Sequence, residues 1–132
     1  MSETSSARIF RITLEVGSLE QAASFYASLL DTPGTRHRGA RHYFDCGVIL
    51  AVLDTTAGGA APTPGAKSLY FAVADLDAVH ARAKALGALA TYEVHGEPAG
   101  EPRKRPWGER SFYVTDAWGN ELCFCQEGTL YT

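Results

Sequence analysis

The sequence predicts an α+β fold built from two tandem βαβββ units within one domain, residues 1–132. Its 132 residues are 45% apolar and 20% charged, which is typical of a single soluble domain with a core of its own. Runs of alternating apolar and polar residues indicate strands, and two helical stripes interrupt them. The pattern Val16-x-x-Leu19-Glu20 returns in the same phase as Val73-x-x-Leu76-Asp77, which indicates an internal repeat.

The first unit is expected over residues 8–55. Alternation predicts a strand over 9–16, with one apolar face made of Phe10, Ile12, Leu14 and Val16. Ser18, with Gln21 three residues later, is a capping box and predicts a helix that runs to Leu30, before Pro33-Gly34. Three further strands are predicted, at 35–38, 41–45 and 48–53.

The second unit is expected over residues 67–127, after a connector of Gly, Ala and Pro at 56–66. A strand over 68–73 leads to a helix that Asp75 caps and Gly87 closes. Another strand is predicted at 89–94. A hairpin then completes the unit, with strands at 112–115 and 121–125 around the turn residues Asp116 to Asn120.

Charge and apolar patterning exclude several classes of partner. The net charge of −3, from 12 basic and 15 acidic residues, gives no reason to expect nucleic acid or an anionic membrane as a partner. The longest apolar run, Val48 to Leu53, is too short to span a bilayer. The N-terminus lacks the basic and apolar regions of a secretory signal, and three cysteines suit a reducing compartment, so we expect a cytoplasmic protein.

Three motifs in order carry a family resemblance. The phrase Leu14-Glu15-Val16-Gly17-Ser18-Leu19-Glu20 runs into Phe25-Tyr26, and the chain closes on Asp116-x-x-Gly119-Asn120-Glu121. With the two βαβββ units, these motifs resemble the vicinal oxygen chelate superfamily of glyoxalases, extradiol dioxygenases and antibiotic-resistance proteins. Pro106-Trp107-Gly108-x-Arg110-x-Phe112 is most similar to the bleomycin-resistance branch. The resemblance implies two curled four-stranded mixed sheets that form a cup, with the helices outside and a ligand inside.

The resemblance also implies where a metal ion would bind. Metal-dependent members place His, Gln or Glu at four inward strand positions, which correspond here to Arg11, Ala51, Ser68 and Cys123. Arginine stays protonated, alanine has no donor atom, serine is a poor ligand, and one cysteine does not hold an ion. We therefore expect no metal and no cofactor. A site made of Cys46, Cys123 and Cys125 is the less favoured alternative. The four histidines form no ligand pair and are expected at the surface or at sheet edges: His37, His42, His80 and His95.

The inward faces predict a binding pocket. Its expected ligand-binding residues are Arg11, Thr13, Ser68, Tyr70, Trp107, Tyr113, Glu121 and Cys123. Arg11 is expected to set the charge preference, either by holding an anionic ligand or by pairing internally with Glu15 or Glu121. The long loop at 96–108 carries Arg103-Lys104-Arg105, which is expected either to face solvent or to cover an anionic ligand.

Three functions fit these residues. The favoured one is a metal-free, homodimeric protein that encloses an aromatic or amphipathic small molecule. Sequestration of a toxic natural product, and so antibiotic resistance, is the role that such a protein would serve. The alternative is an enzyme, either a metal-independent one or a lyase, isomerase or dioxygenase of the same superfamily with its site elsewhere. The third is an accessory domain whose cup its own side chains fill.

Overall fold

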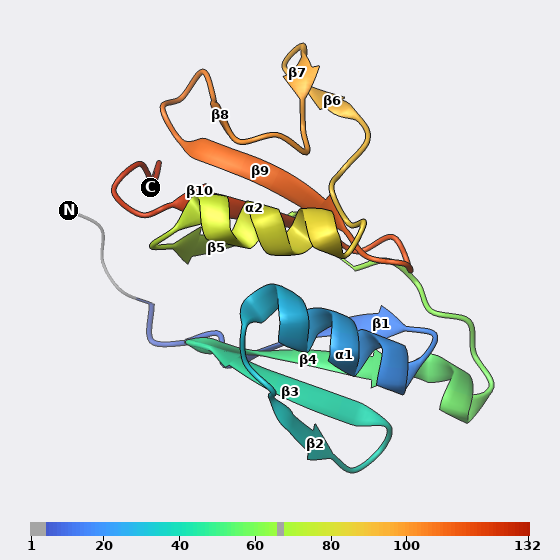
Figure 1. Cartoon of the computed structure of the whole chain (residues 1–132). Helices are drawn as coiled ribbons and strands as arrows, with labels where there is room; N and C mark the ends of the chain where they lie inside the picture. The colour runs from blue at the N-terminus through green and yellow to red at the C-terminus, as the bar shows by residue number, and fades with distance from the viewer. Residues whose placement is uncertain (1–4, 66–67) are drawn as a thin grey trace.

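The computed structural model describes residues 5–65 and 68–132, and its first unit has the predicted order of elements (Figure 1). Strand β1 is followed by helix α1 and three more strands, and together the strands form one sheet in the order β1-β4-β3-β2. Strands β1 and β4 run parallel, whereas the other neighbours are antiparallel. The bounds are β1 Arg11–Val16, α1 Leu19–Leu30, β2 Thr35–His37, β3 Arg41–Cys46 and β4 Val48–Asp54.

The second unit repeats this topology after a short 3-10 helix, Thr55–Gly58. Its sheet has the order β5-β10-β9-β8, with β5 parallel to β10, so it matches the first sheet strand for strand. Residues 66–67, where the connector was predicted to end and the second unit to begin, lie outside the described residues. The bounds are β5 Leu69–Val73, α2 Leu76–Ala85, β8 Arg103–Lys104, β9 Arg110–Thr115 and β10 Glu121–Gln126. The tandem repeat is confirmed.

Both helices begin where the sequence placed their caps. The Ser18 hydroxyl accepts the backbone N–H of Gln21, and the Asp75 carboxylate accepts that of Ala78. These side chains satisfy amide groups that a helix end otherwise leaves unpaired. Neither helix of the described chain has the length and apolar character that a membrane span needs.

The edge of the second sheet differs from the prediction. Instead of one strand over 89–94, the chain pairs with β9 in separate steps: Leu89 bridges Val114, Ala99 accepts the Tyr113 amide, and β8 then pairs with the start of β9. Between these steps the chain leaves the sheet as a small hairpin, β6 Glu93–Val94 with β7 Glu97–Pro98. The two-residue strand β8 is charged and too short to give an alternation signal. The sequence pattern therefore predicted the strand in the more apolar segment upstream of it, residues 89–94.

Gly100 brings this excursion back to the sheet. A Cβ at this position would lie 2.5 Å from the backbone oxygen of Ala90, which is closer than real contacts allow. The two ends of the excursion therefore pass each other at backbone distance, and only glycine fits there.

The two units share one core. Helices α1 and α2 lie next to each other (Figure 1). The helix-facing side chains of both sheets pack against them in one cluster. Leu14 and Val16 of β1 are buried as predicted, whereas Phe10, expected on the same face, is 56% exposed because it precedes the strand. The largest fully buried apolar side chains are Leu14, Val16, Tyr26, Leu29, Phe44, Val52, Leu76, Phe112, Val114, Leu122 and Phe124.

The turn between β9 and β10 ties the second unit to the first. The buried Asp116 carboxylate accepts the Tyr26 hydroxyl of α1 at 2.7 Å and also the side-chain amide of Asn120 at 2.8 Å. The Asn120 amide group also donates to the Glu15 carbonyl of β1, and its oxygen accepts the Gly65 amide of the connector. The closing motif of the sequence is thus a structural cross-link between units.

Candidate ligand-binding site

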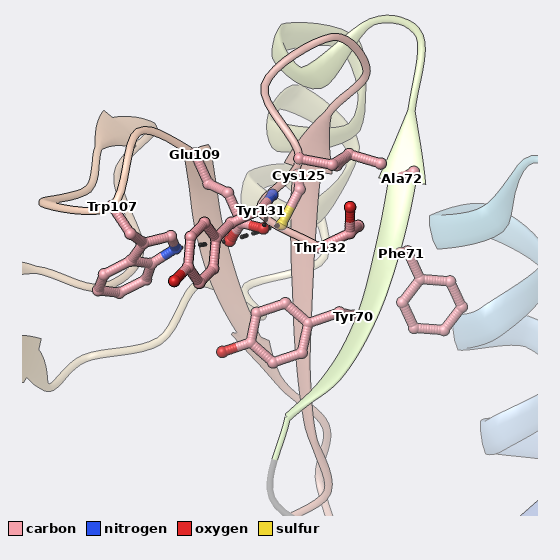
Figure 2. A pocket seen from close by; sticks show the side chains of 9 residues that line it. Tyr70, Phe71, Ala72, Trp107, Glu109, Cys125, Tyr131 and Thr132 are labelled. Atoms are coloured by element: carbon pink, nitrogen blue, oxygen red, sulfur yellow. Dashed lines mark hydrogen bonds between the residues drawn. The ribbon is translucent and has the colours of Figure 1, made fainter. Parts of the chain in front are cut away.

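The open face of the second sheet, the face opposite α2, carries four of the eight predicted pocket residues: Tyr70, Tyr113, Glu121 and Cys123. Cys123 of β10 lies between Tyr70 of β5 and Tyr113 of β9 in the sheet register. Since alternate residues of a strand share a face, Cys125 lies on the same side. Phe71 points the other way, toward the first unit, in Figure 2. The open face therefore lies on the side of the sheet away from the first unit.

A cavity of about 590 Å³ lies on this open face (Figure 2). Segments that are far apart in the sequence form its wall: β5, the loop between β8 and β9, β10 and the end of the chain. The size is within the range of pockets that hold drug-sized molecules. The lining residues are Tyr70, Phe71, Ala72, Trp107, Glu109, Cys125, Leu130, Tyr131 and Thr132.

Glu109 is the charged group of this cavity wall. Its side chain is hydrogen-bonded from two sides: the Trp107 indole donates to Oε1 at 2.7 Å and the Tyr131 backbone amide donates to Oε2 at 2.8 Å. The Cys125 thiol lies 3.8 Å from Oε1. Glu109 is only 6% exposed, so these neutral donors hold a carboxylate that is nearly out of water.

Arg105 is buried behind the cavity, at 2% exposure. Its guanidinium donates to the Ser111 hydroxyl and carbonyl and to the carbonyls of Ala99 and Glu101, and it lies 5.6 Å from the centre of the Tyr113 ring. The prediction that Arg103-Lys104-Arg105 is a uniform basic loop face is wrong for Arg105, because only Arg103 and Lys104 are exposed. Arg105 instead fixes the loop against β9.

Cys123 and Cys125 form a buried thiol pair with Sγ atoms 3.9 Å apart. The Cys125 thiol, and then Ser111, Tyr113 and the positive charge of Arg105, lower the pKa of Cys123 against the opposing effect of burial. The Cys123 thiol, burial and Glu109 raise the pKa of Cys125, so this thiol stays protonated. Cys123 is the better thiolate of the two.

Tyr70, Tyr92 and Tyr113 form a cluster of aromatic rings next to Cys123. The Tyr70 and Tyr113 hydroxyls lie 3.4 Å apart, and the Tyr92 hydroxyl donates to the Glu121 carboxylate at 2.7 Å. Burial, and then the hydrogen bond to Tyr70, raise the pKa of Tyr113, while burial and Glu121 raise that of Tyr92. Both hydroxyls remain protonated donors at neutral pH.

The structure separates the predicted site residues into two groups. Tyr70, Tyr113, Glu121 and Cys123 meet on the open face of the second sheet, and Trp107 lies at the cavity wall. Arg11 and Thr13 lie on the first unit, exposed, on the face of β1 opposite its buried residues. Ser68 precedes β5 with a positive φ of 56° and is half-buried.

Arg11 has neither of the partners expected for it. In the described residues it forms no salt bridge, and its closest polar neighbour is the Tyr43 hydroxyl at 3.4 Å. Glu15 instead accepts the Thr63 amide, and Glu121 accepts Tyr92. The internal ion pair is therefore wrong, and Arg11 does not line the cavity of the second unit.

The four positions that correspond to metal ligands do not suit an ion. Ala51 is fully buried without a donor atom, and the Arg11 guanidinium lies over the Phe10 and Tyr43 rings. Across residues 5–65 and 68–132, no three His, Cys, Asp or Glu side chains are grouped as metal ligands. The alternative site of three thiolates is wrong, because Cys46 is exposed at the end of β3 and Cys123 and Cys125 are buried in the other unit.

The histidines are at the surface or at edges, as predicted, with one partly covered. His37 and His95 are exposed, and the Nε2 of His42 donates to the Pro33 carbonyl on the edge of the first sheet. His80 of α2 lies against the Phe112 ring and 3.5 Å from Glu101, and its side chain is 18% exposed. Trp118, in the turn between β9 and β10, packs over Gly17 at the junction of the units.

A second cavity of about 490 Å³ lies between the units, lined by residues of α1, β4 and β5. Its charged lining residues are Asp45 and Arg82, and the Arg82 guanidinium donates to the Leu29 carbonyl. The lining of this second cavity has no buried charged side chain beside its aromatic residues. The cavity of the second sheet is therefore the better candidate site.

Sequence reasoning missed two residues of this site, Glu109 and Tyr131, and it did not predict that Arg105 is buried behind the cavity. Glu109 is four residues before Tyr113, so extending the alternation of β9 by one step backwards places it on the open face. No pattern separates Arg105 from its exposed neighbours, since its burial depends on carbonyls that the fold brings together. Tyr131 follows the last strand, where alternation gives no information.

Comparisons with known proteins agree with this architecture. The profile of the glyoxalase/bleomycin resistance protein/dioxygenase superfamily matches residues 8–124. A search of curated protein sequences gives no significant match. A glyoxalase/bleomycin resistance protein from Albidiferax ferrireducens is 23% identical with a TM-score of 0.72, over 90% of this chain and 98% of that one.

Two enzymes have similar folds. The oxidase ChaP-H2 is 23% identical with a TM-score of 0.72, over 93% of this chain and 95% of that chain. A lactoylglutathione lyase from Agrobacterium tumefaciens is 22% identical with a TM-score of 0.65, over 94% and 96% of the two chains. At these identities the likeness extends to the fold, and it does not distinguish the bleomycin-resistance branch from the others.

Proposed function

This chain belongs to the glyoxalase/bleomycin resistance protein/dioxygenase superfamily, and we propose that it is a metal-free binding protein that encloses an aromatic or amphipathic small molecule. The cavity on the open face of the second sheet is the proposed site. Sequestration of a toxic natural product, and so antibiotic resistance, is the biological role that such binding would serve in the cytoplasm.

The lining of the cavity is the observation that carries this proposal. Three aromatic side chains, Tyr70, Trp107 and Tyr131, surround a space of about 590 Å³. Tyr70 and Tyr131 are 57% and 73% exposed, and exposed aromatic side chains that gather in one place mark a binding surface. Aromatic faces of this kind favour a flat apolar ligand.

Replacing Trp107 is expected to weaken ligand binding about tenfold, because an aromatic wall of a pocket contributes on the order of 1–2 kcal/mol. The experiment screens aromatic fragments by thermal shift and then titrates the hits into the native protein and Trp107→Leu. Binding of the native state raises the melting temperature.

Trp118→Leu is the matched control, since Trp118 lies at the junction of the units and does not line the cavity. Hits should keep their affinity in that variant. A screen without hits, or hits that depend on Trp118 and ignore Trp107, would contradict the proposed site.

An enzyme is the second candidate, and the lowered pKa of Cys123 is the observation that favours it. A thiolate beside the Tyr113 and Tyr70 hydroxyls supplies both a base and acids on one sheet face. The two candidates separate when a bound fragment is recovered. A binding protein returns the fragment unchanged, whereas an enzyme converts it and Cys123→Ser abolishes the conversion.

We also propose a homodimer. Arg11 on the first sheet and Tyr70 and Tyr131 at the cavity of the second sheet are exposed, so a single chain leaves part of both faces uncovered. A two-fold partner would place the first unit of one copy, with Arg11 and Tyr43, opposite the cavity of the other. Multi-angle light scattering at micromolar concentration is expected to give twice the mass of the 14.2 kDa chain. A measured molar mass equal to that of one chain, up to the highest soluble concentration, would rule the dimer out.

A further inference from the structure

We infer that the cavity of the second sheet selects an organic cation, an ammonium or guanidinium group on an aromatic or aliphatic frame, and that Glu109 is its counter-charge. This inference rests on the proposed function, because it assigns the chemistry of the ligand to the same cavity. It reverses the charge preference expected from Arg11.

The first reason is that Glu109 is buried without a positive partner. Its carboxylate is 6% exposed and accepts hydrogen bonds from the Trp107 indole and the Tyr131 amide, both of which are neutral. No salt bridge within residues 5–65 and 68–132 includes Glu109. A charge removed from water without an opposite charge is costly, and a cationic ligand would offset that cost.

The buried arginine does not supply the missing charge. Arg105 directs its donors to Ser111, Ala99 and Glu101, and its closest carboxylate is that of Glu97, at 3.8 Å. Its contact with Glu109 is between backbone atoms only, from the Arg105 amide to the Glu109 carbonyl. Arg105 is also absent from the cavity wall.

The second reason is the aromatic character of the same wall. Tyr70, Trp107 and Tyr131 come from three separate segments and point into one space beside Glu109 (Figure 2). Aromatic faces attract ammonium and guanidinium groups, most strongly where water is excluded. Aromatic rings combined with a single carboxylate are the usual chemistry of sites for organic cations, whereas an anion would meet repulsion from Glu109.

The third reason is that the wall has no other charged side chain. Of the nine lining side chains, Glu109 alone has an acidic or basic group apart from the tyrosines and Cys125, and the Cys125 thiol stays protonated. Among these side chains, Glu109 is therefore the one whose replacement tests the charge preference.

The test compares three soluble probes of similar size: benzyltrimethylammonium, N,N-dimethylbenzamide and benzoate. Each is titrated into the native protein, Glu109→Gln and Glu93→Gln, and the change in tryptophan fluorescence or in nuclear magnetic resonance shifts is recorded. Glu93→Gln is the matched control, because Glu93 is an exposed carboxylate on β6, outside the cavity wall.

We expect the native protein to bind the ammonium probe at least about tenfold more tightly than the neutral amide, and benzoate most weakly. Glu109→Gln should remove this preference and leave the affinity for the amide unchanged, while Glu93→Gln should bind all three probes like the native protein. Equal affinity for ammonium and amide, or a preference that survives in Glu109→Gln, would overturn the inference and leave the proposed function standing. Failure of all three probes to bind would overturn both.

Discussion

Asp116→Ala is expected to lower the free energy of unfolding by about 3–5 kcal/mol, the largest effect of a single substitution outside the apolar core. The carboxylate is 6% exposed and accepts four hydrogen bonds, from the Tyr26 hydroxyl, the Trp118 amide and the backbone and side chain of Asn120. Alanine leaves these donors buried without an acceptor. Denaturant titration at neutral pH measures the loss.

Tyr26→Phe isolates the bond that joins the units, and we expect it to cost about 1–3 kcal/mol. Burial, and then Asp116, raise the pKa of Tyr26 well above its ordinary value. The pKa of Tyr26 is higher in the folded protein than in the unfolded chain, where it is about 10. The contribution of this hydroxyl to the free energy of unfolding is therefore complete below about pH 10 and is lost as the pH rises further. The difference in stability between the native protein and Tyr26→Phe should therefore shrink above about pH 10.

Asp75→Ala provides the scale for these numbers. It removes one helix-capping bond, to the Ala78 amide, and should cost about 1 kcal/mol. If Asp116→Ala destabilises the protein no more than Asp75→Ala does, the turn does not hold the units together as described.

Arg105→Met is expected to lower the free energy of unfolding by about 2–4 kcal/mol, because it removes the donors that the carbonyls of Ala99, Glu101 and Ser111 share. The methionine keeps most of the side-chain volume, so the loss reports hydrogen bonding and charge. Denaturant titration measures it, with Arg103→Met as the control. Arg103 is an exposed neighbour on the same loop, and its replacement should change stability by less than about 0.5 kcal/mol.

A second readout separates Arg105 from a purely structural role. Its positive charge is one of the causes that lower the pKa of Cys123. Arg105→Met should therefore raise the pKa of Cys123. This pKa is measured from the pH dependence of the ultraviolet absorbance of the thiolate, in a Cys46→Ser background. An unchanged thiolate titration, together with unchanged stability, would show that Arg105 contributes neither charge nor anchoring.

Most of the fold was predictable because local and global signals agree. The caps at Ser18 and Asp75, the alternation of β1 and β10 and the turn at Asp116 each specify the structure that forms. The failure at the edge of the second sheet has a physical cause. Pairing there depends on Ala99 and on the two charged residues of β8, and neither carries an apolar pattern that alternation can detect.

The candidate site was predictable only in part. Alternation placed Tyr70, Tyr113 and Cys123 on one face correctly, because they lie within regular strands. Strand alternation shows which residues of one unit share a face, but it does not show how the two units pack against each other. Arg11 of the first unit was therefore assigned to the same pocket as the residues of the second unit. The charge of the cavity depends on Glu109, which precedes its strand, and on the path of the chain after β10.

The parallel pairing of β1 with β4 and of β5 with β10 has a consequence for folding kinetics. The edge strands β1 and β5 each join their sheet through a partner at the far end of their unit, with the helix and the intervening strands in between. Closing such loops costs chain entropy before the contacts form, so the hairpins β3–β4 and β9–β10 should appear early and the edge strands should dock late. The loop that β5 and β10 must close also contains the β6–β7 excursion, which makes it the longer of the two. The sheet that forms the candidate site is then the slower one to complete.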